Sequence, residues 1–295
     1  MKSKLKILLT ISMTLVVVWI SACKPAASGE DAISPTKTPH PLETPWDDRS
    51  LFKNGLIVSE QEILNNLPGA SVYHIDFQIS DDFLTLTGWE EVHYTNREDV
   101  PLNEIYFQLF PNVAGGKTTI ASLTADRQAV EPVFKFLDSA LLVSLPTPLK
   151  PNDTIDIRMN FEVELALEME GNYGLFGYFD GVLVLDEFYP VISVYDDEGW
   201  NVQAPPPNAD TSYFDTSFYL VRVTAPADLV IAASGIEIDH EQKGDNKVFV
   251  FAAGPSRDFY LAASEHFIVT SQTIEEIVVN SYAFRLLKKS EGTSN

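Results

Sequence analysis

The chain has 295 residues, and its 42 acidic side chains outnumber its 20 lysines and arginines, which gives a formal net charge of −22. So acidic a chain lacks the cationic surface that nucleic-acid binding requires, and it has no electrostatic attraction to anionic lipid. An apolar content of 45% is ample for a packed core and excludes an intrinsically disordered chain.

The N-terminus has the pattern of an export signal. Three lysines among the first six residues precede the apolar run 7–20, which is short for a membrane span but matches the apolar region of a signal peptide. Ile-Ser-Ala-Cys at 20–23 resembles a bacterial lipobox. The resemblance implies a lipoprotein signal peptide over 1–22 and acylation of Cys23, the only cysteine, and hence export to the bacterial cell envelope with a lipid anchor in a membrane. An ordinary secreted protein cleaved near Ala22 is the alternative.

Two connecting segments follow. Residues 23–46 are rich in Pro, Ser and Thr and show no apolar periodicity, which predicts a flexible tether. Residues 47–70 are expected to form a short helical lead-in, because Ser59-Glu60-Gln61-Glu62 is a capping-box pattern ahead of an apolar run and Pro68-Gly69 ends it.

From residue 71 to residue 284 the periodicity of apolar residues is two. In the clearest segment, 155–165, six apolar side chains alternate with five polar ones, as in a strand with one face on a core and one in water. Turn sequences separate the segments. The fold class predicted is all-β, a large antiparallel β-sandwich or saddle, with long ordered loops over 171–215. The other predicted strands are 73–79, 83–94, 104–110, 141–145, 218–224, 229–234, 247–251, 259–263 and 267–270.

The sequence contains no recognisable catalytic motif. The His-Glu-x-x-His pattern of zinc hydrolases is missing, because the residue four positions after His240 is Gly244. The other histidines lack ligand spacing, and those at 74 and 93, in predicted strands, are expected to be exposed or hydrogen-bonded. The Asp-Thr-Ser triplets at 210–212 and 215–217 have no following glycine turn, and the acidic turn 196–199 needs no metal. We therefore predict no metal or catalytic residue in this chain.

A series of short motifs nevertheless resembles a known family. The order of these pieces is similar to the N-terminal β-domain of the aminopeptidase N family of zinc metallopeptidases, especially its bacterial branch, over roughly 70–284. The pieces lie at 73–75, 88–96, 102–112, 149–153, Phe188-Tyr189-Pro190, Asp196-Asp197-Glu198-Gly199-Trp200, 225–235, 253–259 and 279–282.

The resemblance implies a division of labour. In that family a thermolysin-like domain after the β-domain supplies the zinc and the catalytic residues. The resemblance therefore implies that this chain alone is inactive and binds no cofactor, that 285–295 is a truncated stub or frayed tail, and that a catalytic metallopeptidase domain or a split partner would complete the enzyme. A peptide substrate is expected only in that complete enzyme.

The family also suggests a substrate-binding residue. Its β-domain contributes a Gln or Glu that holds the free amine of the substrate, slightly upstream of the Tyr-Pro position. Asp186 and Glu187 are the nearest carboxylates here, and Glu187 is the candidate; a plain surface carboxylate is the alternative. The competing function is a free-standing surface lipoprotein that binds protein, peptide or glycan through aromatic loops at 173–214. An orphaned β-domain is also expected to expose an apolar docking face.

Overall fold

The computed structural model describes residues 40–169, 173–204 and 213–284, which belong to a unit that begins at Pro39. The predicted signal peptide, Cys23, most of the predicted tether and the predicted tail 285–295 lie outside the described residues. Within the described residues, no helix is both long enough and apolar enough to cross a membrane.

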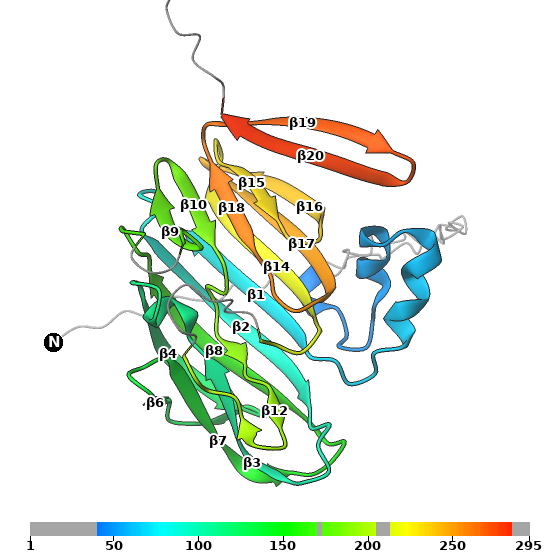
Figure 1. Ribbon diagram of the computed structural model, residues 1–295, viewed down its shortest axis with the longest axis vertical. Coiled ribbons are helices and arrows are strands. Elements are labelled where there is room, and N and C mark those ends of the chain that lie inside the picture. Colours follow the sequence, from blue (N-terminus) through cyan, green and yellow to red (C-terminus); the bar gives the residue numbers. More distant parts are fainter. Residues whose placement is uncertain (1–39, 170–172, 205–212, 285–295) are drawn as a thin grey trace, which may run out of the picture. The chain divides into compact units, whose positions relative to one another are not determined.

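The largest sheet of the described chain has eight strands in the order β16-β17-β14-β1-β2-β8-β4-β5 (Figure 1). The chain is mostly β-structure in several sheets with mainly antiparallel neighbours, which confirms the predicted fold class. The eight strands are β1 (Val72–Ile79), β2 (Thr85–Thr95), β4 (Lys117–Ala125), β5 (Gln128–Ala129), β8 (Thr154–Glu164), β14 (Ser217–Pro226), β16 (Ile236–Lys243) and β17 (Asn246–Ser256).

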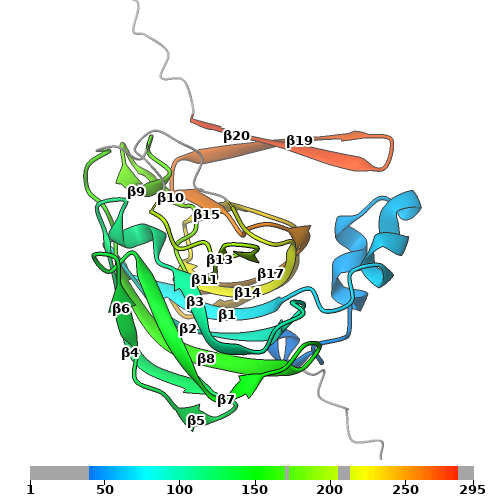
Figure 2. The same cartoon turned by 60° about the horizontal axis from the view of Figure 1, so that its bottom comes forward.

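Four smaller sheets complete the β-structure of the described residues, and Figure 2 shows two of them across one face of the large sheet. The sheet β15-β18-β10-β9 contains β9 (Phe176–Phe179), β10 (Val182–Leu185), β15 (Val230–Ala233) and β18 (Leu261–Ser264). The sheet β11-β3-β7-β6 contains β3 (Leu102–Gln108), β6 (Val133–Lys135), β7 (Ala140–Leu149) and β11 (Val191–Ile192). The two hairpins are β12 (Tyr195–Asp196) with β13 (Gly199–Trp200), and β19 (Phe267–Ile274) with β20 (Ile277–Phe284).

Strand β8 shows the burial that its alternating sequence predicts. Its apolar residues from Ile155 to Val163 are all buried, while the residues between them are half-buried or exposed. The same alternation in β1 and β2 directs one face of the large sheet into the main core, which it shares with the two four-stranded sheets. The segment 171–215, predicted as loops, also contains the short strands β9 to β13 in its described part.

One pair of neighbouring strands differs from the antiparallel prediction. Strands β1 and β14 run parallel, and Tyr73 lies directly opposite Tyr219. A parallel pair needs a long crossover, and here more than a hundred residues separate the two strands. The alternation of apolar residues predicts which face a side chain occupies, but it contains no information on the neighbour or its direction.

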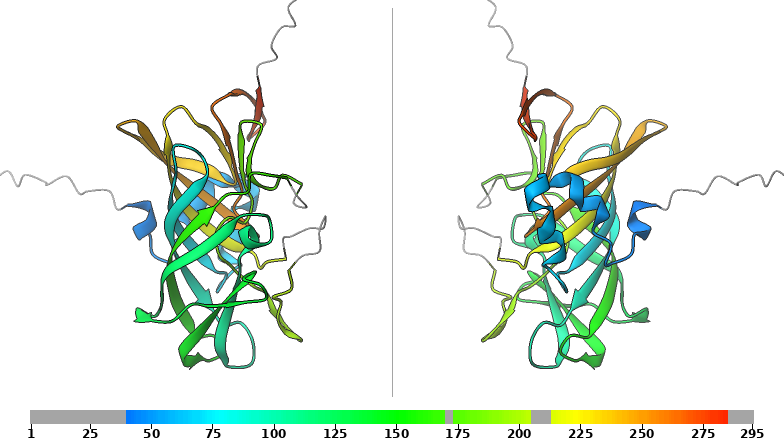
Figure 3. Two further views of the ribbon diagram at one scale, coloured as in Figure 1. Left: turned by 90° about the vertical axis from the view of Figure 1, so that its left-hand side faces the viewer. Right: turned by 90° about the vertical axis from the view of Figure 1, so that its right-hand side faces the viewer.

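The lead-in 47–70 forms short 3₁₀ helices, η2 (Ser50–Gly55) and η3 (Val58–Asn65), and η4 (Phe110–Asn112) follows β3. The prediction of a flexible tether up to residue 46 is wrong at its C-terminal end, because η1 (Pro41–Glu43) lies there and Leu42 is buried in a second core. The predicted capping box is wrong, because Ser59 lies inside η3 and Ile57 is at its N-cap without a side-chain hydrogen bond. The lead-in packs against one end of the outer face of the large sheet (Figure 3), where Phe52 and Leu64 pack with Val72 and Phe218 in this second core.

Candidate functional site

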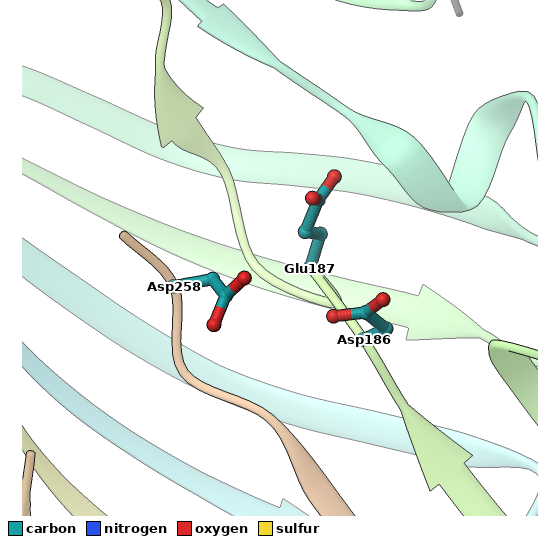
Figure 4. A group of neighbouring side chains, drawn as sticks. All are labelled: Asp186, Glu187 and Asp258. Atoms are coloured by element: carbon teal, nitrogen blue, oxygen red, sulfur yellow. The ribbon is translucent and has the colours of Figure 1, made fainter. Parts of the chain in front are cut away.

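Three acidic side chains, Asp186, Glu187 and Asp258, are close neighbours (Figure 4). One carboxylate oxygen from each lies within 4.8 Å of the others, and within the described residues this is the one group of three Asp, Glu, His or Cys side chains that could share a cation. Glu187 is only 1% exposed, whereas Asp186 and Asp258 are half-buried. We call these three residues the acidic cluster.

Sheet pairing brings the cluster together. Asp186 and Glu187 directly follow β10, and Asp258 lies in the connection between β17 and β18. Strands β10 and β18 are antiparallel, with Leu185 opposite Leu261. The C-terminal end of one strand therefore lies beside the N-terminal end of the other, and residues about seventy positions apart in the chain become neighbours.

The backbone at Glu187 has an unusual conformation. Its φ angle is +46°, in the left-handed region that side chains other than glycine seldom adopt. Asp186 is held by its backbone N–H, which donates to the Leu175 carbonyl oxygen at 3.0 Å. A costly backbone conformation at a buried carboxylate is typical of functional sites, where surrounding contacts maintain it.

Three buried tyrosines adjoin the acidic cluster. The rings of Tyr73 and Tyr219 stack at a centroid distance of 5.0 Å, and the Tyr189 ring meets both edge-on. All three are at most 2% exposed. Such a cluster contributes apolar burial and favourable ring geometry, and each hydroxyl needs a partner inside the core.

Each tyrosine hydroxyl binds the backbone of a segment close to an acidic residue. The Tyr219 hydroxyl donates to the Arg257 carbonyl oxygen at 2.9 Å, and the Phe259 N–H donates to the Tyr189 hydroxyl at 3.0 Å. These two bonds hold both neighbours of Asp258. The Ile192 N–H donates to the Tyr73 hydroxyl at 3.1 Å and holds the segment that follows Glu187.

The negative charge of the acidic cluster changes the pKa of a neighbouring buried tyrosine. Burial raises the pKa of Tyr219 above its ordinary value, and the nearby Asp258 and Glu187 carboxylates raise it further. Burial likewise raises the pKa of Tyr73 and Tyr189. The three phenols therefore stay neutral at physiological pH and act as hydrogen-bonding groups that position the acidic segments.

We expect Tyr219→Phe to lower the free energy of unfolding by about 1–2 kcal/mol, because the fully buried Tyr219 loses its hydrogen bond to the Arg257 carbonyl oxygen while ring packing is kept. Urea denaturation measures this change. Tyr282→Phe, on the partly exposed hairpin strand β20, is the matched control and should change stability by less than about 0.5 kcal/mol. Equal stabilities of the two variants would show that the Tyr219 hydrogen bond contributes nothing.

The sequence predictions for this site have different outcomes. Asp186 and Glu187 do lie together in a partly buried cluster, so Glu187 is not a surface carboxylate. Asp258 was missed as a site residue, although it lies inside the motif at 253–259. Only the pairing of β10 with β18 identifies it. Cys23, the predicted lipidation site, is outside the described residues.

The histidines behave differently from one another. His240 interacts with the side chain of Glu237 on the same strand, and His93 contacts the Asp156 carboxylate at 2.6 Å. His74, expected to be exposed or hydrogen-bonded, is 3% exposed beneath Trp46, and its Nε2 atom has no hydrogen-bond partner in the described residues. The prediction for His74 is therefore wrong at that ring nitrogen, because Trp46, at the end of the predicted tether, covers it.

The remaining motifs have structural roles. Asp196 accepts hydrogen bonds from the Glu198 N–H at 2.8 Å and the Asn201 amide at 2.8 Å, which is turn chemistry and lowers its pKa. Of the aromatic residues in the loops at 173–214, Phe176, Phe188 and Tyr189 are fully buried in the main core, whereas Tyr173 and Tyr213 are exposed, at 66% and 56%.

Comparisons with known proteins give structural similarity only. No family model matches the chain, and no curated protein matches it. A solved M1 zinc metallopeptidase from Deinococcus radiodurans is similar at 20% identity and a TM-score of 0.49, covering 69% of this chain and 42% of that one. A variant of the same enzyme bound to a Tyr-Ser-Ala substrate is similar at 19% identity and a TM-score of 0.49, covering 72% and 46%. The chain thus spans less than half the length of these structures.

Proposed function

We propose that this chain is the non-catalytic N-terminal β-domain of a membrane-anchored, zinc aminopeptidase-like protein, and that its acidic cluster holds the ammonium group of a peptide N-terminus. The observation that carries the proposal is the proximity of Asp186, Glu187 and Asp258. Hydrolysis is assigned to a separate zinc-bearing module, because the sequence has no His-Glu-x-x-His pattern.

The chemistry of the cluster suits an ammonium ion. An ammonium group has three N–H donors and no acceptor, while ionised carboxylates are acceptors only. Three neighbouring carboxyl groups therefore offer one acceptor for each of the three N–H donors, and their negative charge attracts the cation. Hydrogen bonds between charged groups are stronger than neutral ones, and the burial of Glu187 reduces competition from water.

The hairpin β19–β20 is the surface that we assign to docking of the zinc-bearing module. It forms its own two-stranded sheet, and such a hairpin is marginally stable in water by itself. Apolar side chains on it are strongly exposed, among them Ile274 at 55%, Ile277 at 55% and Val278 at 59%. Covering these side chains would stabilise the hairpin, and leaving them uncovered favours self-association.

Membrane attachment rests on the N-terminal sequence. Acyl chains on Cys23 would anchor the chain in the bacterial cell envelope, and residues 23–46 would tether the folded unit to the bilayer.

The experiment compares a free amine with a blocked one. We expect tyrosine amide to perturb the NMR signals of the acidic cluster in the purified chain, whereas N-acetyl-tyrosine amide does not. Glu187→Gln should weaken binding about tenfold, because it removes one charged acceptor. Glu168→Gln, at an exposed carboxylate in the loop after β8, is the matched control and should bind as the unchanged protein does.

Two results would contradict the proposal. Equal binding of tyrosine amide and N-acetyl-tyrosine amide would show that the acidic cluster does not recognise an ammonium group. Zinc-dependent hydrolysis of an aminoacyl arylamide by the purified chain would show that catalysis lies within it rather than in a separate module.

A further inference from the structure

The turn between β6 and β7 exposes two large apolar residues. Leu137 is 98% exposed and Phe136 is 57% exposed. Val113 is also exposed, at 41%, and follows Asn112, which contacts this turn. Single exposed apolar residues are common, but adjacent ones at the end of a hairpin form a convex apolar tip. We call Phe136 and Leu137 the apolar tip.

The backbone of the tip is strained. Phe136, Leu137 and Asp138 have φ angles of 53°, 57° and 65°, three consecutive residues in the left-handed region. None is glycine, and each bears a cost in that region, which leucine and phenylalanine rarely accept. Strain of this kind persists only where the surrounding structure imposes it, and it is a reason to look for a function.

Hydrogen bonds impose the conformation. The Asn112 side-chain amide donates to the Asp138 carbonyl oxygen at 2.6 Å, and the Ser139 hydroxyl donates to the Phe136 carbonyl oxygen at 2.8 Å. The Leu109 N–H donates to the Ser139 carbonyl oxygen at 2.9 Å. The turn is therefore an ordered structure that presents its apolar side chains outward.

The shape and size of the tip favour a bilayer over a protein partner. Two side chains on a convex turn are far smaller than the area that a stable protein interface buries. They suit the interfacial region of a membrane, where aromatic and aliphatic side chains enter while a flanking lysine keeps its ammonium in water. Lys135 directly precedes Phe136 and is exposed. The overall charge of −22 and the adjacent Asp138 oppose contact with an anionic surface, so the expected surface is a zwitterionic one.

We propose that the apolar tip contacts the interface of the membrane that carries the chain. This inference rests on the lipid anchor of the proposed function. The predicted tether, counted from residue 23 to residue 39 because Leu42 and Trp46 pack against the large sheet, would have a root-mean-square reach of about 20–25 Å, which would keep the folded unit at high effective concentration beside the bilayer. Weak insertion of two side chains then suffices to orient the unit on the membrane.

The test uses Leu137→Trp in the acylated full chain, reconstituted on phosphatidylethanolamine–phosphatidylcholine vesicles with or without brominated acyl chains. The fluorescence of the added tryptophan is obtained by subtracting the unchanged protein. We expect a blue shift and loss of most of the added intensity on brominated vesicles. Leu167→Trp, at a 64% exposed position in the loop after β8, is the control and should show neither effect.

Each other outcome overturns the inference. A blue shift without bromine quenching would mean that the tip is buried against protein, and an unshifted, unquenched emission would mean that it stays in water. The intact mass of the purified chain shows separately whether Cys23 is acylated. If the chain is acylated but its added tryptophan is not quenched, only the proposed membrane contact of the apolar tip is contradicted. If Cys23 is not acylated, the proposed lipid anchor and the membrane contact that rests on it are both contradicted.

Discussion

Replacing Glu90 by methionine should raise the free energy of unfolding at pH 7 by about 2 kcal/mol or more. Glu90 lies in β2 opposite Ile75 and Met159 in the main core and is 0% exposed. Neither carboxylate oxygen has a hydrogen-bond partner within the described residues. Methionine has a similar shape and no group that requires water, so the substitution removes a desolvation cost.

The effect should also depend on pH. Burial raises the pKa of Glu90 well above its ordinary value, so the folded protein holds a proton that the unfolded chain releases. Between the ordinary pKa of about 4.5 and the raised one, the folded state binds more protons, and stability falls as pH rises. Glu90→Gln should abolish this fall while retaining an unpaired polar group.

Urea denaturation at several pH values between 5 and 8 measures both effects. Glu91→Gln is the matched control, because the adjacent side chain faces the other side of the sheet and contacts Arg158 at 3.3 Å in a partly exposed pair. Such pairs contribute about 0–1 kcal/mol, so the control should differ little from the unchanged protein. A Glu90→Met variant no more stable than this control would contradict the interpretation of Glu90 as a buried neutral acid.

Replacing His74 by phenylalanine should protect the protein against acid. His74 is buried in β1, and the Trp46 ring stacks on it at a centroid distance of 4.1 Å. Burial lowers the pKa of His74 to about 4, although the Leu42 backbone and Asp156 act in the opposite direction. The unfolded chain, with a pKa near 6.5, therefore binds a proton before the folded protein does.

The sign of this effect is opposite to that of Glu90. As pH falls from about 6.5 to about 4, the unfolded state takes up the proton first, and stability falls by about 3 kcal/mol. Phenylalanine keeps a ring beneath Trp46 and does not titrate. The variant should therefore lose less stability over this range than the unchanged protein.

Denaturation curves at pH 7, 6, 5 and 4 check the expectation. His240→Gln is the control, because that histidine is exposed on β16 and its substitution should leave the acid loss in place. Other charged groups around His74, namely Glu91, His93, Asp156 and the acidic residues after Trp46, are unchanged in both variants. Equal acid losses in the His74→Phe variant and the control would rule out the histidine as the cause.

The position of Glu90 also shows how far the sequence can be interpreted. The alternation of β2 places Glu90 on the same face as Leu86 and Val92, so a signal for a buried acid is present in the sequence. Its significance depends on whether a polar group from another strand lies opposite. The neighbouring strands contribute Ile75 and Met159, and only the sheet pairing shows this.

The acidic cluster likewise depends on sheet pairing that the sequence does not show. The Tyr-Pro motif indicated Asp186 and Glu187, because the resemblance concerns residues close together in the chain. Asp258 entered through the antiparallel pairing of β10 with β18, which no local pattern predicts. The tyrosines that hold the cluster likewise depend on the parallel pairing of β1 with β14.

The amino-acid sequence alone determined the β-class of this protein, most of its longer strands and the absence of a His-Glu-x-x-His motif. Period-two alternation and turn residues are local properties, so they can be recognised without a structure. The tertiary structure decided which strands are neighbours, which carboxylates meet and which polar groups are sealed in the core. Those outcomes depend on packing between segments far apart in the chain, which alternation within one strand does not specify.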